Sequence, residues 1–470
     1  MTTTLYWFRQ DLRVSDNPAL LTAIQSGDVL PVYILDDENA GQHKMGAASR
    51  VWLHYALESL NQSLDGKLLI LKGNPLSIIP KLMSENKIQS IFWNRCYEPW
   101  RIGRDKALKL KLEKLGLRVQ SFNGSLLWEP WENLKDNGDP YKVFTPYFRK
   151  ACKTQNPRKP LKSPANLSLV KIAMTYENVE SLNLLPSIKW HEKIVREWDI
   201  SEEGAVEKLH HFLKEGVADY KEGRNFPAKK NVSRLSPYLH FGQISPNEIW
   251  HTAKFYSDDE NVETFCTELG WREFSYNLLY HFPELKTKNL QAKFDHFPWD
   301  ENEEFLKKWQ RGKTGYPIVD AGMRELWQTG FMHNRVRMVV ASFLVKNLRI
   351  HWHQGEKWFW DCLIDADHAS NSASWQWVAG SGADAAPYFR VFNPITQGER
   401  FDPEGAYITK YVPELAKLPI KYLFNPWEAP KSTLAEAGIE LGSDYPLPMV
   451  DVKASREAAL SAYAFIKLCG

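Results

Sequence analysis

Three residues near the middle of the chain combine the spacing of one helix face with side chains suited to binding a ligand. Glu268, Trp271 and Arg272 stand at i, i+3 and i+4 in the segment ELGWREF. On a helix these positions are neighbours, so a carboxylate, a flat aromatic ring and a guanidinium would point the same way. Taken alone, such a triplet is more often a surface ion pair beside a core tryptophan. The residues by themselves leave both interpretations open.

Two further polar sets could hold a ligand. Asp365 and Asp367 are two apart, at a loop or helix entry, and Asn371 follows four residues later. Paired carboxylates are typical of general acid–base catalysis or of a metal site. The segment Ser233–Ser236 ends in a Ser-Pro pair that marks a helix start, where backbone N–H groups and hydroxyls suit a pyrophosphate. An ordinary N-cap is the alternative for that segment.

Other nucleotide and metal motifs are incomplete. No G-x-G-x-x-G follows the first expected strand, so the dinucleotide fingerprint is missing. Gly312-Lys313-Thr314 resembles the end of a phosphate loop, but Lys307 stands where that loop needs glycine. His351 and His353 flank Trp352 without sharing a helix face. We therefore expect no metal site in this protein.

Composition indicates a large globular protein. The chain has 470 residues, of which 43% are hydrophobic and 25% charged, close to the globular average. A net charge of +2 neither favours nor excludes a nucleic-acid partner, because basic residues can gather on one face. The five cysteines are scattered and form no C-x-x-C pair, which favours a reducing compartment. With no long apolar run, we expect a soluble protein of the cytoplasm, associated with the nucleoid in a bacterium.

The elements that must position these residues fall into two kinds. Up to about residue 130, short apolar runs alternate with helical periods, which predicts a doubly wound parallel α/β domain. The expected strands are Thr4–Phe8, Val29–Leu35, Leu68–Leu71, Ser90–Trp93 and Arg118–Phe122, and the clearest helical periods are Ala48–Leu64 and Ile102–Leu115. Asn17 and Pro18 mark a helix start. Residues 131–200, with the segment NPRKPLKSPA, form a connector, and residues 201–470 an all-α domain.

Several long segments closely resemble the photolyase and cryptochrome family. They are WFRQDLRVSDNPAL near the N-terminus, YKEGRNFPAKKNVSRLSPYLHFGQISP from Tyr220, ELGWREF from Glu268, TGYPIVDAGMRELWQTGFMHNRVRM from Thr314, and DADHASNSASWQWVAGSGADAAPYFRVFN from Asp365. The resemblance runs from near residue 4 to about residue 415 and looks closest to class I cyclobutane pyrimidine dimer photolyases. It implies an α/β antenna-binding domain and a helical FAD-binding catalytic domain. It also implies blue-light-driven repair of DNA, in which excited reduced FAD passes an electron to a flipped-out dimer.

The resemblance assigns residues to these tasks. Those expected to hold FAD are Tyr220, Ser233, Arg234, Leu235, Ser236, Arg272, Asn334, Arg337, Asp365, Asp367 and Asn371. Those expected at the dimer or the DNA are Glu268, Trp271, Asn334, Arg335, Met338 and Trp377, and the expected electron-transfer chain is Trp375, Trp352 and Trp299. Glu268 would stabilise the dimer radical anion, Arg337 would pair with Asp365, and Asn371 would face flavin N5.

The chain departs from the family pattern in a few places. Val232 replaces a common threonine, and His368, Ser370 and the run Ser372–Ser374 replace small, Gly-rich positions.

Glu98 matches an antenna contact. That match implies a second chromophore, methenyltetrahydrofolate rather than deazaflavin.

The expected partner is DNA containing pyrimidine dimers, with no membrane partner, and we expect a monomer. Three alternatives remain. A cryptochrome-type photoreceptor is disfavoured by Asn371 and by Asn334 with Met338. A (6-4) photolyase would carry histidines at the positions of Asn334 and Met338. A nucleotide-binding α/β protein with a helical partner domain leaves the ordered motifs unexplained.

Overall fold

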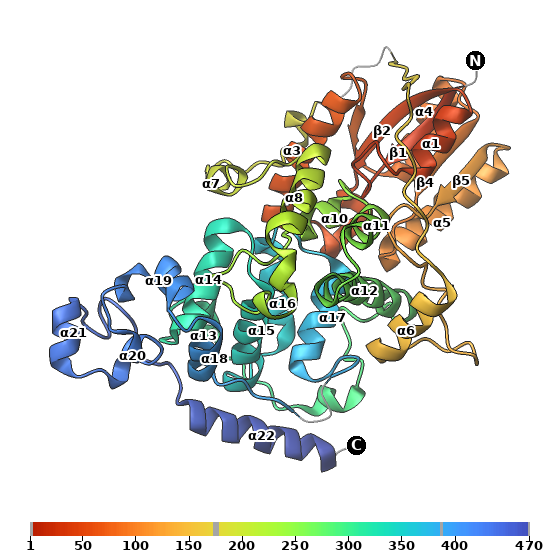
Figure 1. The fold of residues 1–470 in the computed structure, drawn as a ribbon. Helices are drawn as coiled ribbons and strands as arrows, with labels where there is room; N and C mark the ends of the chain where they lie inside the picture. The colour runs from red at the N-terminus through yellow and green to blue at the C-terminus, as the bar shows by residue number, and fades with distance from the viewer. Residues whose placement is uncertain (1–2, 173–177, 386–388, 469–470) are drawn as a thin grey trace. The chain divides into compact units, whose positions relative to one another are not determined.

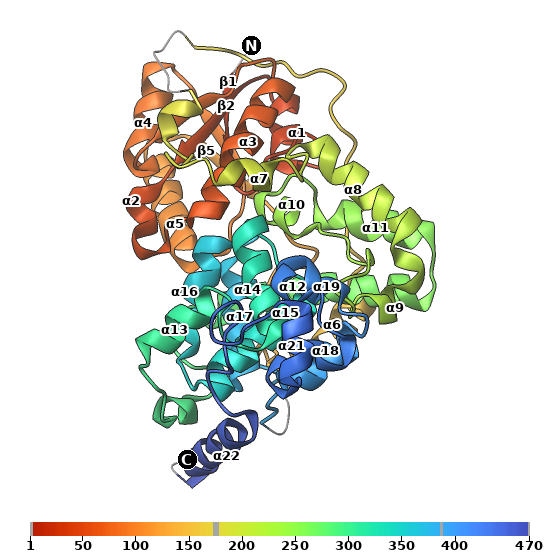
Figure 2. The ribbon, with the colours of Figure 1, turned by 90° about the vertical axis from the view of Figure 1, so that its left-hand side faces the viewer.

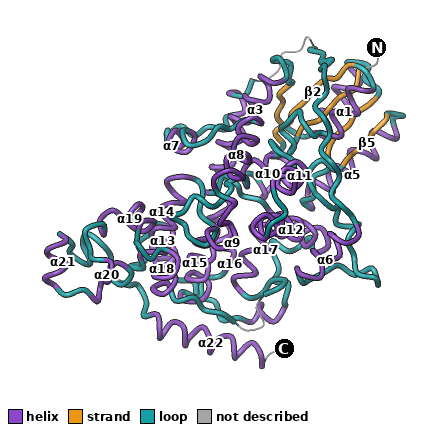
Figure 3. Tube along the Cα trace, viewed as in Figure 1, coloured by secondary structure: helices purple, strands orange, loops and turns teal. Residues whose placement is uncertain are grey.

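The chain divides into two compact units. In the computed structural model, residues 3–172, 178–385 and 389–468 are described. Unit 1 comprises Met1–Lys214, Ser233–Pro283 and Ile364–Ala369, and unit 2 comprises Glu215–Val232, Glu284–Leu363 and Ser370–Gly470. The strands of the sheet lie in the N-terminal part, and the later part of the chain is helical (Figure 3). The expected fold class, an α/β domain followed by a helical domain, is confirmed.

Unit 1 is built on a five-stranded sheet (Figure 1). Its strands are β1 (Thr3–Phe8), β2 (Asp28–Leu35), β3 (Leu69–Lys72), β4 (Ser90–Asn94) and β5 (Arg118–Phe122). Their order is β3-β2-β1-β4-β5, and every neighbouring pair is parallel. All five predicted strands are present, with bounds that differ by at most one residue. Apolar runs bounded by turns were therefore a sufficient signal for a sheet that is covered on both faces.

Helices connect the strands of this sheet. They are α1 (Pro18–Gln25), α2 (Asp37–Ala40), α3 (Ala47–Ser63), α4 (Pro75–Glu85) and α5 (Pro99–Lys114). As predicted, Asn17 caps α1, because its side chain accepts the Leu20 N–H at 3.1 Å, and Pro18 opens the helix. Leu5 and Trp7 of β1 belong to one buried core that also holds Leu82 of α4 and Leu108 of α5. The sheet and its helices are seen from a second direction in Figure 2.

The connector is fastened to the sheet domain within unit 1. Leu161 donates its N–H to Asp16, and Arg158 forms an ion pair with the same carboxylate. Further along, Val29 of β2 donates to Ser168 O and accepts from the Val170 N–H. The remaining helices of this unit are α6 (Phe144–Thr154), α7 (His191–Val195), α8 (Glu202–Glu215), α10 (Ser236–Phe241), α11 (Pro246–Tyr256) and α12 (Glu260–His281).

Unit 2 is helical. Its elements include α9 (Tyr220–Gly223), α13 (Glu303–Gln310), α14 (Pro317–Thr329), α15 (Asn334–Ser342), the π-helical turn η5 (Phe343–Asn347), α16 (Trp352–Cys362), α18 (Pro394–Phe401), α19 (Ala406–Tyr411), α20 (Ile420–Leu423), α21 (Lys431–Ala437) and α22 (Val452–Leu468). Helix α17 (His368–Ala379) begins in the last residues of unit 1 and continues in unit 2. Across the described residues, no helix has both the length and the apolar composition needed to cross a membrane.

Candidate functional site

Helix α12 presents the predicted face of acidic, aromatic and basic side chains. Glu268, Trp271 and Arg272 all lie on this helix, and each is partly exposed. The ring of Trp271 stacks on Phe144 of α6, with centroids 3.8 Å apart and planes 11° apart. Phe144 is itself buried, so it covers one face of the indole. Trp271 is thus a fixed flat surface with one covered side, which suits stacking on a planar ligand.

A buried polar network extends from α12 to the segment before α17. Arg272 donates to Glu273 at 2.7 Å, and its guanidinium lies 4.9 Å from the centre of the Tyr276 ring. The Tyr276 hydroxyl donates in turn to Asp367. Glu273 also accepts the Leu127 N–H at 2.7 Å, yet burial outweighs these contacts and raises the pKa of Glu273 to about 7. The network fixes Arg272 and Asp367, both predicted cofactor ligands.

The segment Ser233–Ser236 leads into α10. Helix α10 begins at Ser236, and no side chain caps its first turn, so the ordinary N-cap alternative is wrong. Arg234 has a positive φ of 54°, an uncommon backbone conformation for a residue other than glycine. The Ser236 hydroxyl donates to Asp365 at 2.6 Å, so the structure brings together two of the predicted FAD residues. Backbone N–H groups without a side-chain cap can donate to an anion such as a pyrophosphate.

Helix α15 carries the next predicted group, in unit 2. Asn334 begins this helix and Met338 follows one turn later, which places both on one face. His333 precedes them and caps the helix, accepting the Arg335 N–H at 3.2 Å through Nδ1. Burial lowers the pKa of His333 to about 3, so its ring stays neutral and keeps the acceptor that the cap requires.

Arg335 lies in a cluster of positive charge within unit 2. Its guanidinium donates to Asn225 Oδ1 and lies 4.4 Å from the centre of the Phe401 ring. Burial lowers the pKa of Arg335, and the nearby charges of Arg224, Arg400 and Arg390 lower it further. These four arginines are the arginine cluster. Such a concentration of positive charge attracts a polyanion, and a bound phosphate would relieve the repulsion.

Helix α17 holds Asn371 in its first turn. Asn371 is buried, and its Nδ2 donates to the backbone oxygen of Glu356 on α16 at 3.1 Å. Since an amide nitrogen has two N–H donors, this bond leaves one for a ligand. Ser372, one of the departures from the family pattern, donates to Glu356 Oε1 at 2.8 Å. Burial raises the pKa of Glu356 and this bond opposes the rise, so the serine serves as a partner for a buried carboxyl group.

The three predicted electron-transfer tryptophans all lie in unit 2. Trp375 and Trp352 are buried, and Trp299 is partly exposed. Trp375 lies against Gly355 of α16, where an added Cβ would come within 2.1 Å of its ring. His351 contacts both of the other two rings, with centroids 4.8 Å from Trp299 and 5.6 Å from Trp352. The arrangement runs from a buried ring to one that reaches solvent.

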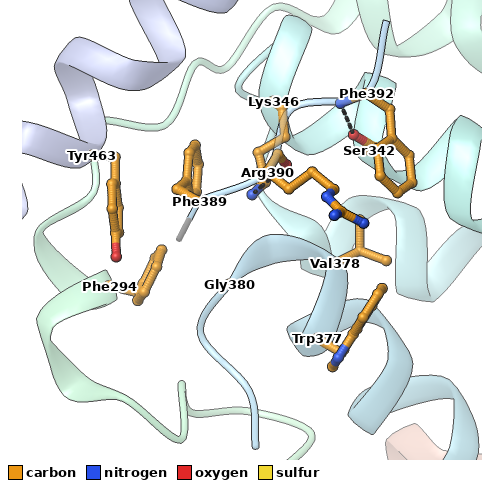
Figure 4. A pocket seen from close by; sticks show the side chains of 10 residues that line it. All are labelled: Phe294, Ser342, Lys346, Trp377, Val378, Gly380, Phe389, Arg390, Phe392 and Tyr463. Atoms are coloured by element: carbon orange, nitrogen blue, oxygen red, sulfur yellow. Dashed lines mark hydrogen bonds between the residues drawn. The ribbon is translucent and has the colours of Figure 1, made fainter. Parts of the chain in front are cut away.

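Trp377 lines a small cavity of about 60 Å³ in unit 2 (Figure 4). Its indole N–H donates to Asp384 O at 3.1 Å. Other side chains of the cavity include Phe389, Arg390 and Lys346. Lys346 is almost fully buried, its Nζ lies over the Phe389 ring, and desolvation lowers its pKa well below the usual range.

Three other predicted residues, Glu98, Tyr220 and Arg337, make contacts of their own. Glu98 follows β4 and precedes α5, is buried, and forms an ion pair with Arg101 at 3.3 Å. Tyr220 begins α9 in unit 2, with the Arg224 guanidinium 5.4 Å from its ring centre. Arg337 donates to Met332 O at 2.7 Å. Arg337 and Asp365 belong to different units, and their pairing stays a prediction.

Five residues that contribute to these groups were not predicted from the sequence. Phe144 and Gly355 lie against the rings of Trp271 and Trp375, and no spacing rule links them. Arg224, Arg390 and Arg400 act on Arg335 through their charge. In the described part of the chain, no group of three or more His, Cys, Asp or Glu residues could hold a metal ion.

Comparisons with known proteins connect the two units to one family. Residues 4–165 match the family model described as DNA photolyase, and residues 265–465 match the FAD binding domain of DNA photolyase. A deoxyribodipyrimidine photo-lyase of Agrobacterium fabrum is 49% identical, covering 98% of each chain. Cryptochrome-2 of Arabidopsis thaliana is 38% identical, covering 98% of this chain and 78% of the relative.

Solved structures extend the likeness to the fold. A bacterial class III photolyase from Agrobacterium tumefaciens has a TM-score of 0.95 and 48% identity, covering 99% of this chain and 98% of the other. A cryptochrome from Synechocystis has a TM-score of 0.90 and 31% identity, covering 98% and 99%. The first likeness does not support the expected placement closest to class I.

Proposed function

Because this chain belongs to the photolyase and cryptochrome family, we propose that it repairs cyclobutane pyrimidine dimers in DNA with light and bound FAD. The main support for the proposal is the arginine cluster. Its central residue, Arg335, lies on the same helix as Asn334 and Met338. A concentration of positive charge beside these residues suits an enzyme that must hold the DNA backbone. The likeness to the Agrobacterium tumefaciens protein supports class III as the subclass.

FAD is the proposed cofactor, and the residues present suit it. The uncapped start of α10 and Ser233 offer donors to the phosphates, and Asn371 has one N–H left for flavin N5. Arg272 and Asp367 are held in place by Glu273 and Tyr276 before any ligand arrives. When bound and reduced, FAD would supply the electron that opens the dimer ring and would take it back afterwards. A second chromophore, methenyltetrahydrofolate near Glu98, is part of the proposal.

The protein's own residues would bind and orient the substrate. The arginine cluster would grip the DNA backbone, and the lesion would flip out at reduced cost because a dimer already disturbs pairing. Trp271, supported by Phe144, would stack on the flipped base. Glu268 would hydrogen-bond the pyrimidine and stabilise the negative charge that develops on it. The family resemblance also assigns Asn334 and Met338 to the dimer, and Trp377 would add an aromatic surface.

The experiment separates binding from turnover. For the wild type, Glu268→Gln and Asn334→Ala, the affinity for an oligonucleotide with one thymine dimer is measured in darkness, and its repair is followed under blue light. We expect both variants to bind damaged DNA and to repair it at least tenfold more slowly, because Glu268 acts on the charge that develops during reaction and Asn334 is assigned to both the flavin and the dimer. The exposed Glu436→Gln should repair like the wild type. Full repair by both site variants would contradict the assigned roles.

A further inference from the structure

Two histidines stand beside two of the proposed electron-transfer tryptophans. His351 precedes α16 and Trp352 is the first residue of that helix. The His351 ring lies 4.8 Å from the Trp299 ring and 5.6 Å from the Trp352 ring. His353 contacts Trp352 at 3.9 Å and His351 at 4.4 Å, measured between ring centroids. His351 is thus in ring contact with both tryptophans at once.

The protonation of His351 is fixed by a hydrogen bond. Its Nδ1 accepts the His353 N–H at 3.1 Å and so caps α16. A nitrogen that accepts this bond cannot carry a proton, so the capping ring is neutral with its hydrogen on Nε2. Protonation of Nδ1 would break the cap. The geometry alone therefore ties the neutral state of the ring to the start of the helix.

Burial and one neighbouring ring favour the same neutral state of His351. Its pKa is lowered to about 4, chiefly by burial and in part by His353, while Asp295 of η4 (Ala292–His296) opposes the shift. Burial also lowers the pKa of His353, while a hydrogen bond with the Lys286 backbone opposes this shift and the Lys286 charge adds to it. On the adjoining segment, Arg349 and Asp300 form a long ion pair at 3.9 Å. Near neutral pH the ring therefore adds no positive charge beside Trp299 or Trp352.

We propose that His351 is a positioning residue for electron transfer. Its ring holds Trp299 and Trp352 in place, and because the ring is neutral, it does not repel the positive charge that moves from one tryptophan to the other. The inference rests on the proposed electron-transfer role of these tryptophans. In the step concerned, one electron leaves Trp299 and reduces oxidised Trp352. A thiol in solution then returns one electron to Trp299, releases its proton to water and becomes a thiyl radical, and two such radicals combine to a disulfide; oxidised FAD is the final acceptor. In the transfer from Trp299 to Trp352 itself, no bond forms or breaks.

The Trp299 side chain suits such a charge-carrying role. Its indole nitrogen is buried, and among the described residues it has no hydrogen-bond partner. With no acceptor beside it, the oxidised indole would keep its proton and its positive charge. A second positive charge on His351, about 5 Å away, would repel it strongly at the effective dielectric of a protein. The neutral histidine avoids this repulsion.

Two substitutions separate the bridging ring from the helix cap. His351→Asn keeps a good capping side chain and removes the ring, whereas His351→Phe keeps a ring and removes the cap and the titrating group. The FAD-bound proteins are photoreduced with a thiol, and tryptophan radical absorbance is followed by transient spectroscopy. At pH 7 we expect several-fold slower formation of the Trp299 radical in His351→Asn and a near-normal rate in His351→Phe.

The dependence of the radical-formation rate on pH distinguishes the proposed role of His351 from a purely structural one. As the pH falls through about 4, the wild type should slow by about tenfold because the ring gains charge, while His351→Phe should not. The exposed His211→Gln should follow the wild type. Nitrogen NMR of labelled histidine should show an unprotonated His351 Nδ1 at pH 7. Wild-type rates in His351→Asn, or the same pH profile in His351→Phe and the wild type, would overturn the inference.

Failure of the electron-transfer chain itself would look different. Trp352→Phe should abolish photoreduction if the proposed chain operates. If Trp352→Phe is photoreduced normally, the chain is wrong and the role of His351 falls with it. If Trp352→Phe is inactive and both His351 variants match the wild type, only the inference about His351 is wrong.

Discussion

The indole of Trp271 stacks on the ring of Phe144 with their planes only 11° apart. The two residues are more than a hundred positions apart in sequence, and both belong to unit 1. Phe144 lies on α6, in the segment that follows the sheet domain, so the structure gives the connector a part in the candidate site.

This contact predicts a loss of lesion recognition in Phe144→Leu. The leucine fills much of the volume but offers no flat surface, so Trp271 loses its support. We expect several-fold weaker binding to dimer-containing DNA, with undamaged DNA bound as before, and about 1 kcal/mol lower stability. Phe212→Leu is the matched control, because Phe212 packs on Phe265 of the same α12. It should lose similar stability without losing the preference for damaged DNA.

Burial of Glu273 predicts a pH-dependent stability. Its folded pKa, about 7, lies above the ordinary value of 4.5, so the folded state binds the proton more tightly than the unfolded state. This contribution to stability is fully present below about pH 4.5 and is lost as the pH rises through about 7. Urea unfolding of the wild type and of Glu273→Gln between pH 5 and 8 measures it.

The amide of Glu273→Gln can still accept the Leu127 N–H but cannot ionise. The free energy of unfolding of Glu273→Gln should therefore fall less with rising pH than that of the wild type. The difference between the two decreases should be at most about 3 kcal/mol. Glu436→Gln, at an exposed position, should keep the wild-type slope. Identical slopes for the wild type and Glu273→Gln would show that Arg272 holds Glu273 ionised throughout.

Helix α16 approaches the Trp375 ring so closely at Gly355 that adding one methyl group there should disturb the ring. Gly355→Ala would place Cβ about 2.1 Å from the indole, so the ring must move. We expect a loss of about 1–3 kcal/mol and slower photoreduction of the FAD-bound protein. Gly103→Ala on α5 has open space around its Cβ and should be neutral or stabilising by up to about 1 kcal/mol. Unchanged melting and photoreduction in Gly355→Ala would contradict the packing described.

The arginine cluster predicts a salt-dependent phenotype. Arg335→Gln should weaken binding to damaged and undamaged DNA alike, and the slope of log K against log salt should become shallower by about one unit. Lys307→Gln removes an exposed positive charge that pairs with Glu303 and serves as the control. An unchanged salt dependence in Arg335→Gln would show that DNA does not contact the arginine cluster.

Local signals in the sequence were sufficient for much of the fold and for part of the site. Parallel strands read as apolar runs, Asn17 and Pro18 mark a helix start by local chemistry, and the spacing of Glu268, Trp271 and Arg272 needs only one helix. Ser236 and Asp365 could be predicted to share a ligand through the family resemblance alone, because their contact spans more than a hundred residues.

What could not be predicted depends on long-range packing. Nothing near Phe144 in sequence points to Trp271, and Gly355 has no positive φ to mark it as special. In the sequence, His351 and His353 indicate neither a helix cap nor a contact with two tryptophans, whereas in the structure His351 makes a capping bond and has two tryptophan neighbours. The subclass prediction was not supported either, since motifs shared across a family carry little subclass information.

The most direct test uses the wild-type protein with reduced FAD and two oligonucleotides, one with a cyclobutane thymine dimer and one with a (6-4) photoproduct. Each is incubated under blue light and in darkness, and intact thymines are counted by chromatography. We expect loss of the cyclobutane dimer in the light only, and no repair of the (6-4) product. Bound, photoreducible FAD with no repair of either lesion would contradict the proposed function and would favour a cryptochrome-type photoreceptor.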